Sequence, residues 1–249
     1  MKSNELPGHS RTVLKARYAL LTPGGFAPSR LPGWEKAVCN IPISPALGAQ
    51  FSQLLVTLEH DGQCLGNTGG NQYFIYVIEG NASIVLDDRR HRLEPGSYVY
   101  LPAGKDVQIK SGGAASRIVI FQKKYEPLPG ADRPPAMVGH ERDAKGQPFP
   151  GNGDARLQVL LPDQPGYDMA VNILTFQPGT TSPCVQTSIM EHGLVMLRGQ
   201  GIYRLEEDWH PVQAGDVIWM APYCPQWFVA MGKLPASYIC YQDVNRDPM

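Results

Sequence analysis

The sequence has no long apolar segment, no excess of charge of either sign and no closely spaced pair of cysteines. Its 22 Lys and Arg residues balance 23 Asp and Glu residues, which gives a formal net charge of −1. Proteins that bind nucleic acids or anionic membranes need a basic surface, so we expect neither partner. No stretch approaches the roughly 18 apolar residues of a transmembrane helix, and the N-terminus lacks the roughly 7–15-residue apolar core of a secretory signal.

The five cysteines are spread along the chain, at Cys39, Cys64, Cys184, Cys224 and Cys240. No two of them form a CxxC pair or a zinc-finger spacing. An odd number of separated cysteines is typical of a reducing compartment, where thiols stay unpaired. We therefore expect a soluble, cytoplasmic protein.

Turn-forming residues, in contrast, are abundant. Together the 26 Gly and 23 Pro residues make up about a fifth of the 249 residues, against a usual share of about 12%. Such frequent interruption favours many short strands joined by turns over long helices. The composition predicts an all-β fold, with helix only in short pieces near the N-terminus.

The two halves of the chain carry the same order of strand and turn segments. Gly80 matches Gly199 and Gly96 matches Gly215, and each pair is 119 positions apart. Around both pairs the sequence reads as strand, glycine turn, strand, acidic turn and a third strand that ends near a proline. Five matched segments in one order indicate an internal duplication.

A segment with the composition of a linker separates the halves. Residues 125–156 are rich in Pro, Gly and charged residues, as flexible connections are. We place the boundary near residue 150. The predicted domains are an N-terminal unit, 1–150, which includes the linker, and a C-terminal unit, 151–249, which carries the candidate site.

Motifs of the second half resemble those of the cupin superfamily. Gly215, Pro222, Cys224 and Gln226 resemble the second cupin motif, and residues 179–199 align with the first, G-x5-H-x-H-x3-4-E-x6-G. In that superfamily alternate side chains of the motifs point into a small antiparallel barrel of jelly-roll type and bind a metal. The resemblance implies an all-β fold of two tandem cupin barrels, a bicupin.

Three strings of the second half narrow the resemblance: GQGIYRL, WHPVQAGDVIWMAPYCPQW and SYICYQDVNRDP. They look like the C-terminal cupin of (S)-ureidoglycine aminohydrolases, bicupin enzymes of allantoin degradation. That family implies manganese-dependent hydrolysis of ureidoglycine to ureidoglycolate and ammonia, with the metal as Lewis acid and a lysine of the last strand assisting. It also implies a small-molecule substrate and a homo-oligomer.

Several positions of the family's site hold other residues here. The family's ligands are a glutamate, two histidines and a glutamine, and the matching positions are Gln186, Ser188, His192 and Gln226. The position of the lysine is Gln242. Neutral amide and hydroxyl oxygens are poor replacements for carboxylate and imidazole around Mn²⁺. The resemblance therefore implies either manganese held weakly by His192 and Gln226, or no metal.

The substrate-binding candidates each have a plainer alternative. Gln186, Ser188 and Gln226 could hold a polar substrate by hydrogen bonds without a metal, or the two amides could satisfy each other inside the barrel. Asn172, in a matched strand, belongs to the same group. His192 is either a metal ligand or a hydrogen-bonded histidine that remains from one.

Gln242, Tyr238 and Tyr203 are the catalytic candidates. The tyrosines match family positions near the substrate, where a phenol can donate a hydrogen bond or a proton; the alternative is packing. Cys184 and Cys224 each precede a candidate glutamine by two residues. That spacing allows a thiolate ligand or nucleophile, but a small buried hydrophobe is the commoner role.

The first half offers no comparable group. Val107 and the pair Asn71 and Gln72 stand where ligands would lie, and no His, Asp or Glu pair has a suitable spacing. We expect this barrel to be structural. In the second half, strand alternation predicts that Glu191 points away from the pocket that its neighbour His192 faces.

Three functions remain open from the sequence. The leading hypothesis is an enzyme of the resembled family that hydrolyses a small ureido-amino acid. The second is a metal-free isomerase, cyclase or lyase in which amides, His192 and tyrosines polarise a carbonyl by hydrogen bonding. The third is a binding protein that kept the barrel and lost the chemistry. Metal content separates the first from the others, and turnover separates the second from the third.

Overall fold

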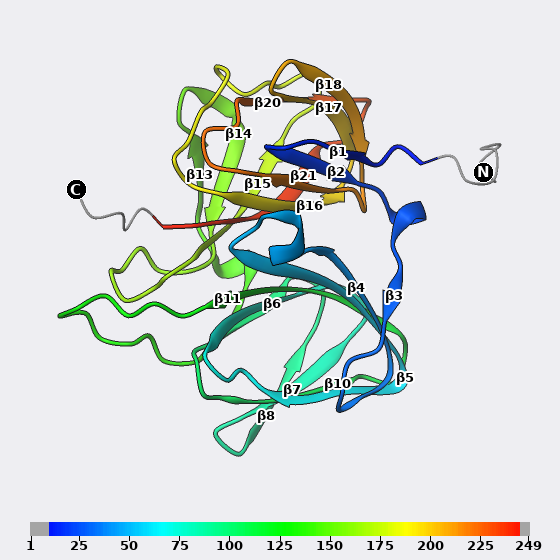
Figure 1. Cartoon of the computed structure of the whole chain (residues 1–249), viewed down its shortest axis with the longest axis vertical. Coiled ribbons are helices and arrows are strands. Elements are labelled where there is room, and N and C mark those ends of the chain that lie inside the picture. The colour runs from blue at the N-terminus through cyan, green and yellow to red at the C-terminus, as the bar shows by residue number, and fades with distance from the viewer. Residues whose placement is uncertain (1–9, 245–249) are drawn as a thin grey trace.

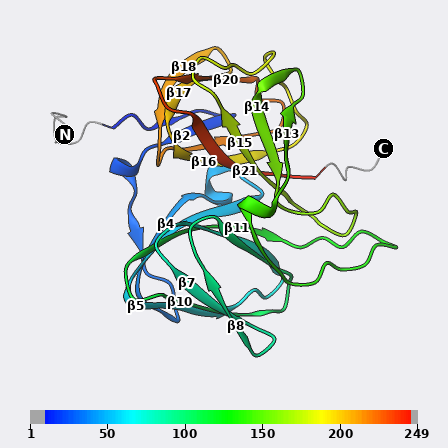
Figure 2. The same ribbon diagram turned by 180° about the vertical axis from the view of Figure 1, so that it is seen from behind.

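A computed structural model describes residues 10–244 as two β-barrels, one above the other (Figures 1 and 2). Three short 3-10 helices, at Pro23–Gly25, Pro45–Leu47 and Glu141–Asp143, are the helical elements of this range. None of them has the length and apolar character needed to span a bilayer. The prediction of an all-β chain is confirmed.

One sheet of ten strands rolls up into the N-terminal barrel, in the order β12-β9-β6-β11-β5-β10-β7-β8, with β4 on β5 and β3 on β4. The long strand β5 pairs with β11 through its first residues and with β10 through its last, so it bends the sheet. The strands are β3 (Pro28–Ser29), β4 (Trp34–Ile43), β5 (Phe51–Asn67), β6 (Asn71–Glu79), β7 (Ala82–Leu86), β8 (Arg89–Leu93), β9 (Ser97–Leu101), β10 (Asp106–Ser111), β11 (Ser116–Lys124) and β12 (Met137–His140).

The C-terminal barrel combines a sheet of eight strands, β1-β2-β19-β16-β21-β15-β14-β13, with a sheet of three, β18-β17-β20. The strands are β1 (Val13–Leu14), β2 (Tyr18–Leu21), β13 (Gly146–Phe149), β14 (Asn152–Val159), β15 (Ala170–Phe176), β16 (His192–Arg198), β17 (Gln200–Leu205), β18 (Asp208–Gln213), β19 (Val217–Met220), β20 (Gln226–Met231) and β21 (Ala236–Gln242).

Strand pairing connects segments on the N-terminal side of residue 150 to the second barrel. Strand β2 pairs with β19, with Tyr18 opposite Met220 and Leu21 opposite Val217. Strand β13 also joins the C-terminal sheet, through β14. The N-terminal segment therefore crosses to the second barrel, because β19 would otherwise present an unpaired edge.

The matched glycines occupy the same conformation in both halves. Gly80 and Gly199 have φ angles of +73° and +74°, and Gly96 and Gly215 have +90° and +93°. In the first pair, an added Cβ would run into the backbone at the start of β11 for Gly80 and at the start of β21 for Gly199. Equal left-handed turns at equivalent positions, a conformation that favours glycine, support the internal duplication.

Apolar side chains fill the interior of the N-terminal barrel. Val107, one of the predicted ligand positions, is part of this cluster. Gln72 is fully buried but turns toward the second barrel, where its amide donates to Asp168 at 3.2 Å. Val107 and Gln72 are thus engaged in the core of the barrel and in the contact between the barrels.

An aromatic core joins the two barrels. On β21, Tyr238 and Cys240 face the interior of the C-terminal barrel, whereas Tyr241 faces the N-terminal barrel. The ring of Tyr241 stacks on Phe51, with centroids 4.0 Å apart, and on Phe121, at 5.8 Å. Each stacked pair is worth up to about 1.5 kcal/mol beyond the area it buries.

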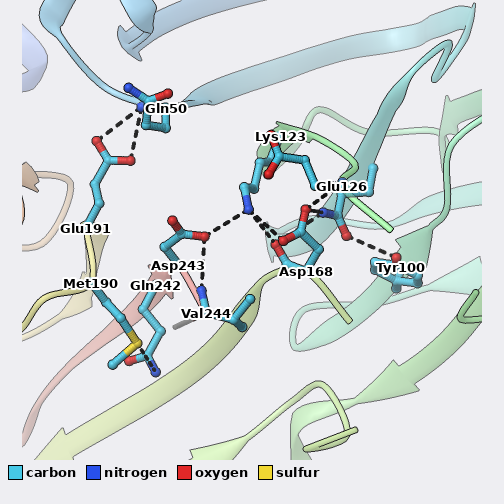
Figure 3. A network of polar contacts seen from close by, with 11 residues as sticks. Gln50, Tyr100, Lys123, Glu126, Asp168, Met190, Glu191, Gln242, Asp243 and Val244 are labelled. Atoms are coloured by element: carbon cyan, nitrogen blue, oxygen red, sulfur yellow. Dashed lines mark hydrogen bonds and ion pairs between the residues drawn. The ribbon is translucent and has the colours of Figure 1, made fainter. Parts of the chain in front are cut away.

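A buried ion-pair network crosses the same interface (Figure 3). The ammonium of Lys123, on β11, donates to Asp168 Oδ1 and to Asp243 Oδ1, both at 2.8 Å. Asp168 also accepts from the backbone N–H of Glu126 at 2.8 Å. Burial by itself would lower the pKa of Lys123, but its hydrogen bonds to the two aspartates outweigh burial and raise that pKa. Lys123 is therefore a cation that ties the start of β15 to the end of β21.

We expect Lys123→Met to lower the free energy of unfolding by about 3 kcal/mol, because it leaves a buried carboxylate without its cation. Urea denaturation of the full chain measures this loss. The exposed neighbour provides the control: Lys124→Met should change the stability by no more than about 0.5 kcal/mol. Equal losses in the two variants would contradict the role given to Lys123.

Candidate active site

A cavity of about 510 Å³ lies in the C-terminal barrel. All eight residues that the sequence assigned to the site line it: Asn172, Gln186, Ser188, His192, Tyr203, Gln226, Tyr238 and Gln242. Among the described residues, the lining includes no Asp, Glu, Lys or Arg. Its polar chemistry is that of carboxamides, hydroxyls, thiols and one imidazole.

Strand alternation gathers the residues of β15, β16 and β21. His192 lies opposite Gln242, and Asn172 lies opposite Cys240. Side chains of directly opposed residues point to the same face of a sheet. The register therefore aims all four side chains into the cavity.

Glu191 points the other way, as alternation predicts, but it is buried rather than solvated. Its carboxylate accepts from the backbone N–H of Gln50 at 3.0 Å and from Trp219 Nε1 at 2.7 Å. Burial raises its pKa, and both hydrogen bonds oppose that rise. Glu191 belongs to the contact between the barrels, not to the site.

Gln186 and Gln226 come together through their backbones. Gln186 N donates to Gln226 O at 2.8 Å, and Gln226 N donates to Gln186 O at 2.9 Å. The side chain of Gln226 is held by Tyr203, whose hydroxyl donates to Oε1 at 2.7 Å. Within residues 10–244 the two side-chain amides make no hydrogen bond to each other. The Nε2 group of Gln226 can thus donate to a ligand.

His192 is an uncharged imidazole at neutral pH. Burial lowers its pKa to about 4, although a hydrogen bond to the Met190 backbone opposes this effect. A neutral imidazole offers one acceptor nitrogen. His192 can therefore accept a hydrogen bond or a proton in the cavity, as a weaker base than an ordinary histidine.

Tyr203 and Tyr238 stand side by side, with ring centroids 6.3 Å apart. Burial raises the pKa of both phenols well above the ordinary value. Both stay protonated at physiological pH, so they act as hydrogen-bond donors rather than bases. They also pack against Phe228, so the binding and packing roles are not exclusive.

Cys184 and Cys224, which the sequence treated alike, lie in different surroundings. Cys184 is exposed and lines the cavity, whereas Cys224 is buried in the core of the barrel, where burial raises its thiol pKa to about 11. Cys240, not singled out from the sequence, lines the cavity, and burial raises its pKa to about 12. Its thiol is therefore protonated and unreactive at neutral pH.

Other lining residues escaped sequence reasoning for identifiable reasons. Cys240 and Leu174 lie two positions from Gln242 and Asn172 on the same strands, so alternation would have found them. Phe149, on β13, also lines the cavity. It lies in the segment assigned to the linker, and nothing in its local pattern shows that this segment pairs with β14.

Comparison with known proteins identifies the family. No protein-family model matches the chain. The chain is 38% identical over 248 residues to a probable (S)-ureidoglycine aminohydrolase of Oryza sativa subsp. japonica, over 98% of this chain and 79% of that protein. It is 35% identical over 243 residues to the (S)-ureidoglycine aminohydrolase of Escherichia coli (strain K12), over 96% and 93% of the two chains. The chain belongs to the (S)-ureidoglycine aminohydrolase family.

Solved structures confirm the bicupin architecture. The E. coli protein Ylba superposes with a TM-score of 0.87 at 32% identity, over 96% of both chains. An oxalate decarboxylase of Bacillus subtilis, described for its Mn(II) centres, superposes with a TM-score of 0.71 at 10% identity, over 96% of this chain and 80% of that one. The second likeness shows the fold alone.

The manganese implied by the resemblance does not fit the residues present in this member of the ureidoglycine aminohydrolase family. Within residues 10–244 no group of three or more His, Cys, Asp or Glu side chains is arranged to hold a metal ion. At the other three positions that match the family's ligands, the donors are the amides of Gln186 and Gln226 and the hydroxyl of Ser188. These donors supply no negative charge to offset a dication. We therefore derive no chemical step through a metal.

The lowered pKa of His192 predicts a loss of stability in acid. Unfolded chains bind a proton at this residue below about pH 6.5, and the folded protein does so only near pH 4. The free energy of unfolding should therefore fall by about 3 kcal/mol as the pH drops through this window. Urea denaturation at several pH values tests it. His192→Gln should flatten the pH slope, and an unchanged slope in that variant would assign the loss to other groups.

Restoring the family's ligands should restore a metal site. We expect Gln186→Glu with Ser188→His to bind Mn²⁺ stoichiometrically, because a carboxylate and a second imidazole then join His192 and Gln226. Electron paramagnetic resonance measures free and bound Mn²⁺ in wild type and variant. Adding His192→Ala to the double variant should abolish the gain. No gain in the double variant would show that these positions do not converge on one ion.

Proposed function

We propose that the C-terminal cavity binds a small ureido-amino acid of the ureidoglycine type and that the protein releases ammonia from it. The observation that carries this proposal is the near full-length similarity to proteins named (S)-ureidoglycine aminohydrolase. The convergence of the corresponding positions on one cavity supports it.

The lining complements a ureido group. Such a group presents one planar carbonyl acceptor and several N–H donors. A carboxamide can donate from its NH₂ group to that carbonyl and accept from those N–H groups with its own oxygen. Asn172, Gln186, Gln226 and Gln242 supply four carboxamides to the cavity. Tyr203 fixes one of them, Gln226, in place. A volume of about 510 Å³ is ordinary for a small-molecule site.

The titratable residues of the site divide into an acceptor and two donors. Neutral His192 accepts a proton or hydrogen bond from water or from the substrate. Protonated Tyr238 donates to oxygen or nitrogen atoms that gain charge, and aimed donors lower such barriers. Tyr203 donates its proton to Gln226 Oε1 and so positions that amide. With its pKa near 4, His192 is a weak base, so we expect slow turnover.

Ammonia release from freshly generated ureidoglycine, above the uncatalysed background, tests the proposal. We expect release in the presence of protein, and because the donors do not suit Mn²⁺, neither added Mn²⁺ nor a chelator should change the rate. No release under any condition would overturn the proposal. Release only with added Mn²⁺ would keep the activity and overturn the conclusion on the metal.

A matched pair of variants locates the activity. Gln226→Leu should lower kcat/KM by about tenfold, because it removes a positioned hydrogen-bonding amide. Gln200→Leu changes an exposed glutamine outside the cavity and should leave kcat/KM unchanged.

A metal-free carbonyl reaction or simple binding is the second candidate, and the uncharged lining favours it. N-carbamoylglycine carries the ureido group but lacks the amino group on the α-carbon that ureidoglycine would release. It can therefore report binding to the cavity without turnover. Saturable binding of this compound without ammonia release from ureidoglycine would support the second candidate.

A further inference from the structure

Lys123 connects the N-terminal barrel to the end of the strand that carries Gln242. Its ammonium donates to Asp243 Oδ1 at 2.8 Å, and Asp243 directly follows Gln242 in the chain (Figure 3). The backbone N–H of Asp243 donates to Glu191 O at 3.0 Å, and Glu191 directly precedes His192. These contacts therefore lie one residue away from Gln242 and His192, which are opposite each other and line the cavity.

Gln242 depends on such an anchor because it is the last residue of β21. Its pairing with Ala170 on β15 and with His192 on β16 ends both ladders. Strand ends open locally unless they are tied down. Within residues 10–244 the side chain of Gln242 makes one polar contact, a weak one of 4.0 Å from Nε2 to Met190 Sδ. The place of this carboxamide in the cavity is thus set by its backbone.

The same ammonium also holds the start of the neighbouring strand, β15. It donates to Asp168 Oδ1 at 2.8 Å and to the backbone carbonyl of Asp168 at 3.0 Å. Asp168 lies two residues before β15, which carries Asn172 into the cavity. Lys123 therefore joins the beginning of one strand of the site to the end of the next, where Ala170 pairs with Gln242.

Attachment of the two barrels to each other is the plainer explanation of this ion pair. Lys123 and Asp243 occupy equivalent positions of the duplicated chain, 120 residues apart. The equivalent pair two positions earlier, Phe121 and Tyr241, joins the barrels by aromatic stacking at 5.8 Å. A second apolar pair would serve the same purpose, because replacing a buried ion pair by well-packed apolar residues is often neutral or stabilising.

The geometry of the ammonium favours a role beyond attachment. A lysine ammonium has three N–H donors, and here Asp168 takes two of them and Asp243 takes one. With every donor engaged, the ammonium fixes two separate chain segments relative to each other. An apolar contact would hold the same segments together without fixing their relative position.

We propose that Lys123 is a positioning residue of the candidate active site: it holds Asp243 and thereby keeps the carboxamide of Gln242 in place. Lys123 belongs to β11 and does not itself line the cavity. The N-terminal barrel thus takes part in ligand recognition through its contact with the strands of the site. This inference rests on the proposed binding of a ureido group by the carboxamides of the cavity.

The kinetics of ammonia release from ureidoglycine measure the effect on the site. Lys123→Met should raise KM by about tenfold and leave kcat within about twofold, because a displaced carboxamide weakens the hold on the ureido group. Ile109→Ala is the control for a merely weakened fold. It opens a void in the apolar core of the N-terminal barrel, away from the interface, so it should lower the stability and leave KM unchanged.

A double variant shows whether Lys123 acts through Gln242. Gln242→Leu alone should raise KM by about as much as Lys123→Met does. Adding Lys123→Met to Gln242→Leu should then change kcat/KM by less than about twofold, because the group that Lys123 positions is already gone. A purely structural role predicts that the two effects multiply.

Amide hydrogen exchange of the full chain, followed by NMR, tests the anchor without any substrate. The amide of Asp243, which is bonded to Glu191 O, should exchange at least about tenfold faster in Lys123→Met than in wild type, because the strand end then opens locally. In Ile109→Ala this amide should keep its wild-type rate.

The inference is overturned if the effects of Lys123→Met and Gln242→Leu multiply, if Ile109→Ala raises KM as much as Lys123→Met, or if the exchange of Asp243 is unchanged. Failure of the proposed function looks different: the wild type would neither release ammonia nor bind N-carbamoylglycine. The exchange rates would then decide by themselves whether Lys123 fixes the end of β21.

Discussion

Three strands of this protein are buried on both faces, and most of its organisation depends on that constraint. Strands β15, β16 and β21 separate the candidate active site from the N-terminal barrel, so alternate residues enter two different environments. His192 and Gln242 face the cavity, while their neighbours Glu191 and Asp243 enter the polar contacts between barrels. A change on either face of this wall therefore acts on the other face through the same backbone.

The site combines a cavity of about 510 Å³ with an uncharged lining. The positions that match the family's ligands line this one cavity, and Tyr203 holds Gln226. The exchange of charged and metal-ligating groups for amides and a hydroxyl suits recognition by hydrogen bonds and leaves little to activate water strongly.

Much of the fold followed from the sequence, because it rests on local rules. The matched glycines predicted equal turns, and their φ angles agree. Alternation predicted that Glu191 points away from the cavity that His192 lines, and Glu191 contacts Trp219 instead. What sequence reasoning missed depends on contacts between distant segments. No local pattern pairs β2 with β19 or β13 with β14, and none shows that Lys123 finds both of its aspartates across the interface.

The pairing of β2 with β19 has a consequence for the order of folding. Strand β2 closes the C-terminal barrel by pairing with residues about 200 positions further along the chain. During synthesis β2 must wait for β19 before the two can pair, while the N-terminal barrel can complete its own sheet earlier. Closure of a loop of this length is slow, and until it occurs the strand remains an exposed edge that other chains can capture. The second barrel is thus the vulnerable partner during synthesis, although in the finished protein it holds the candidate active site.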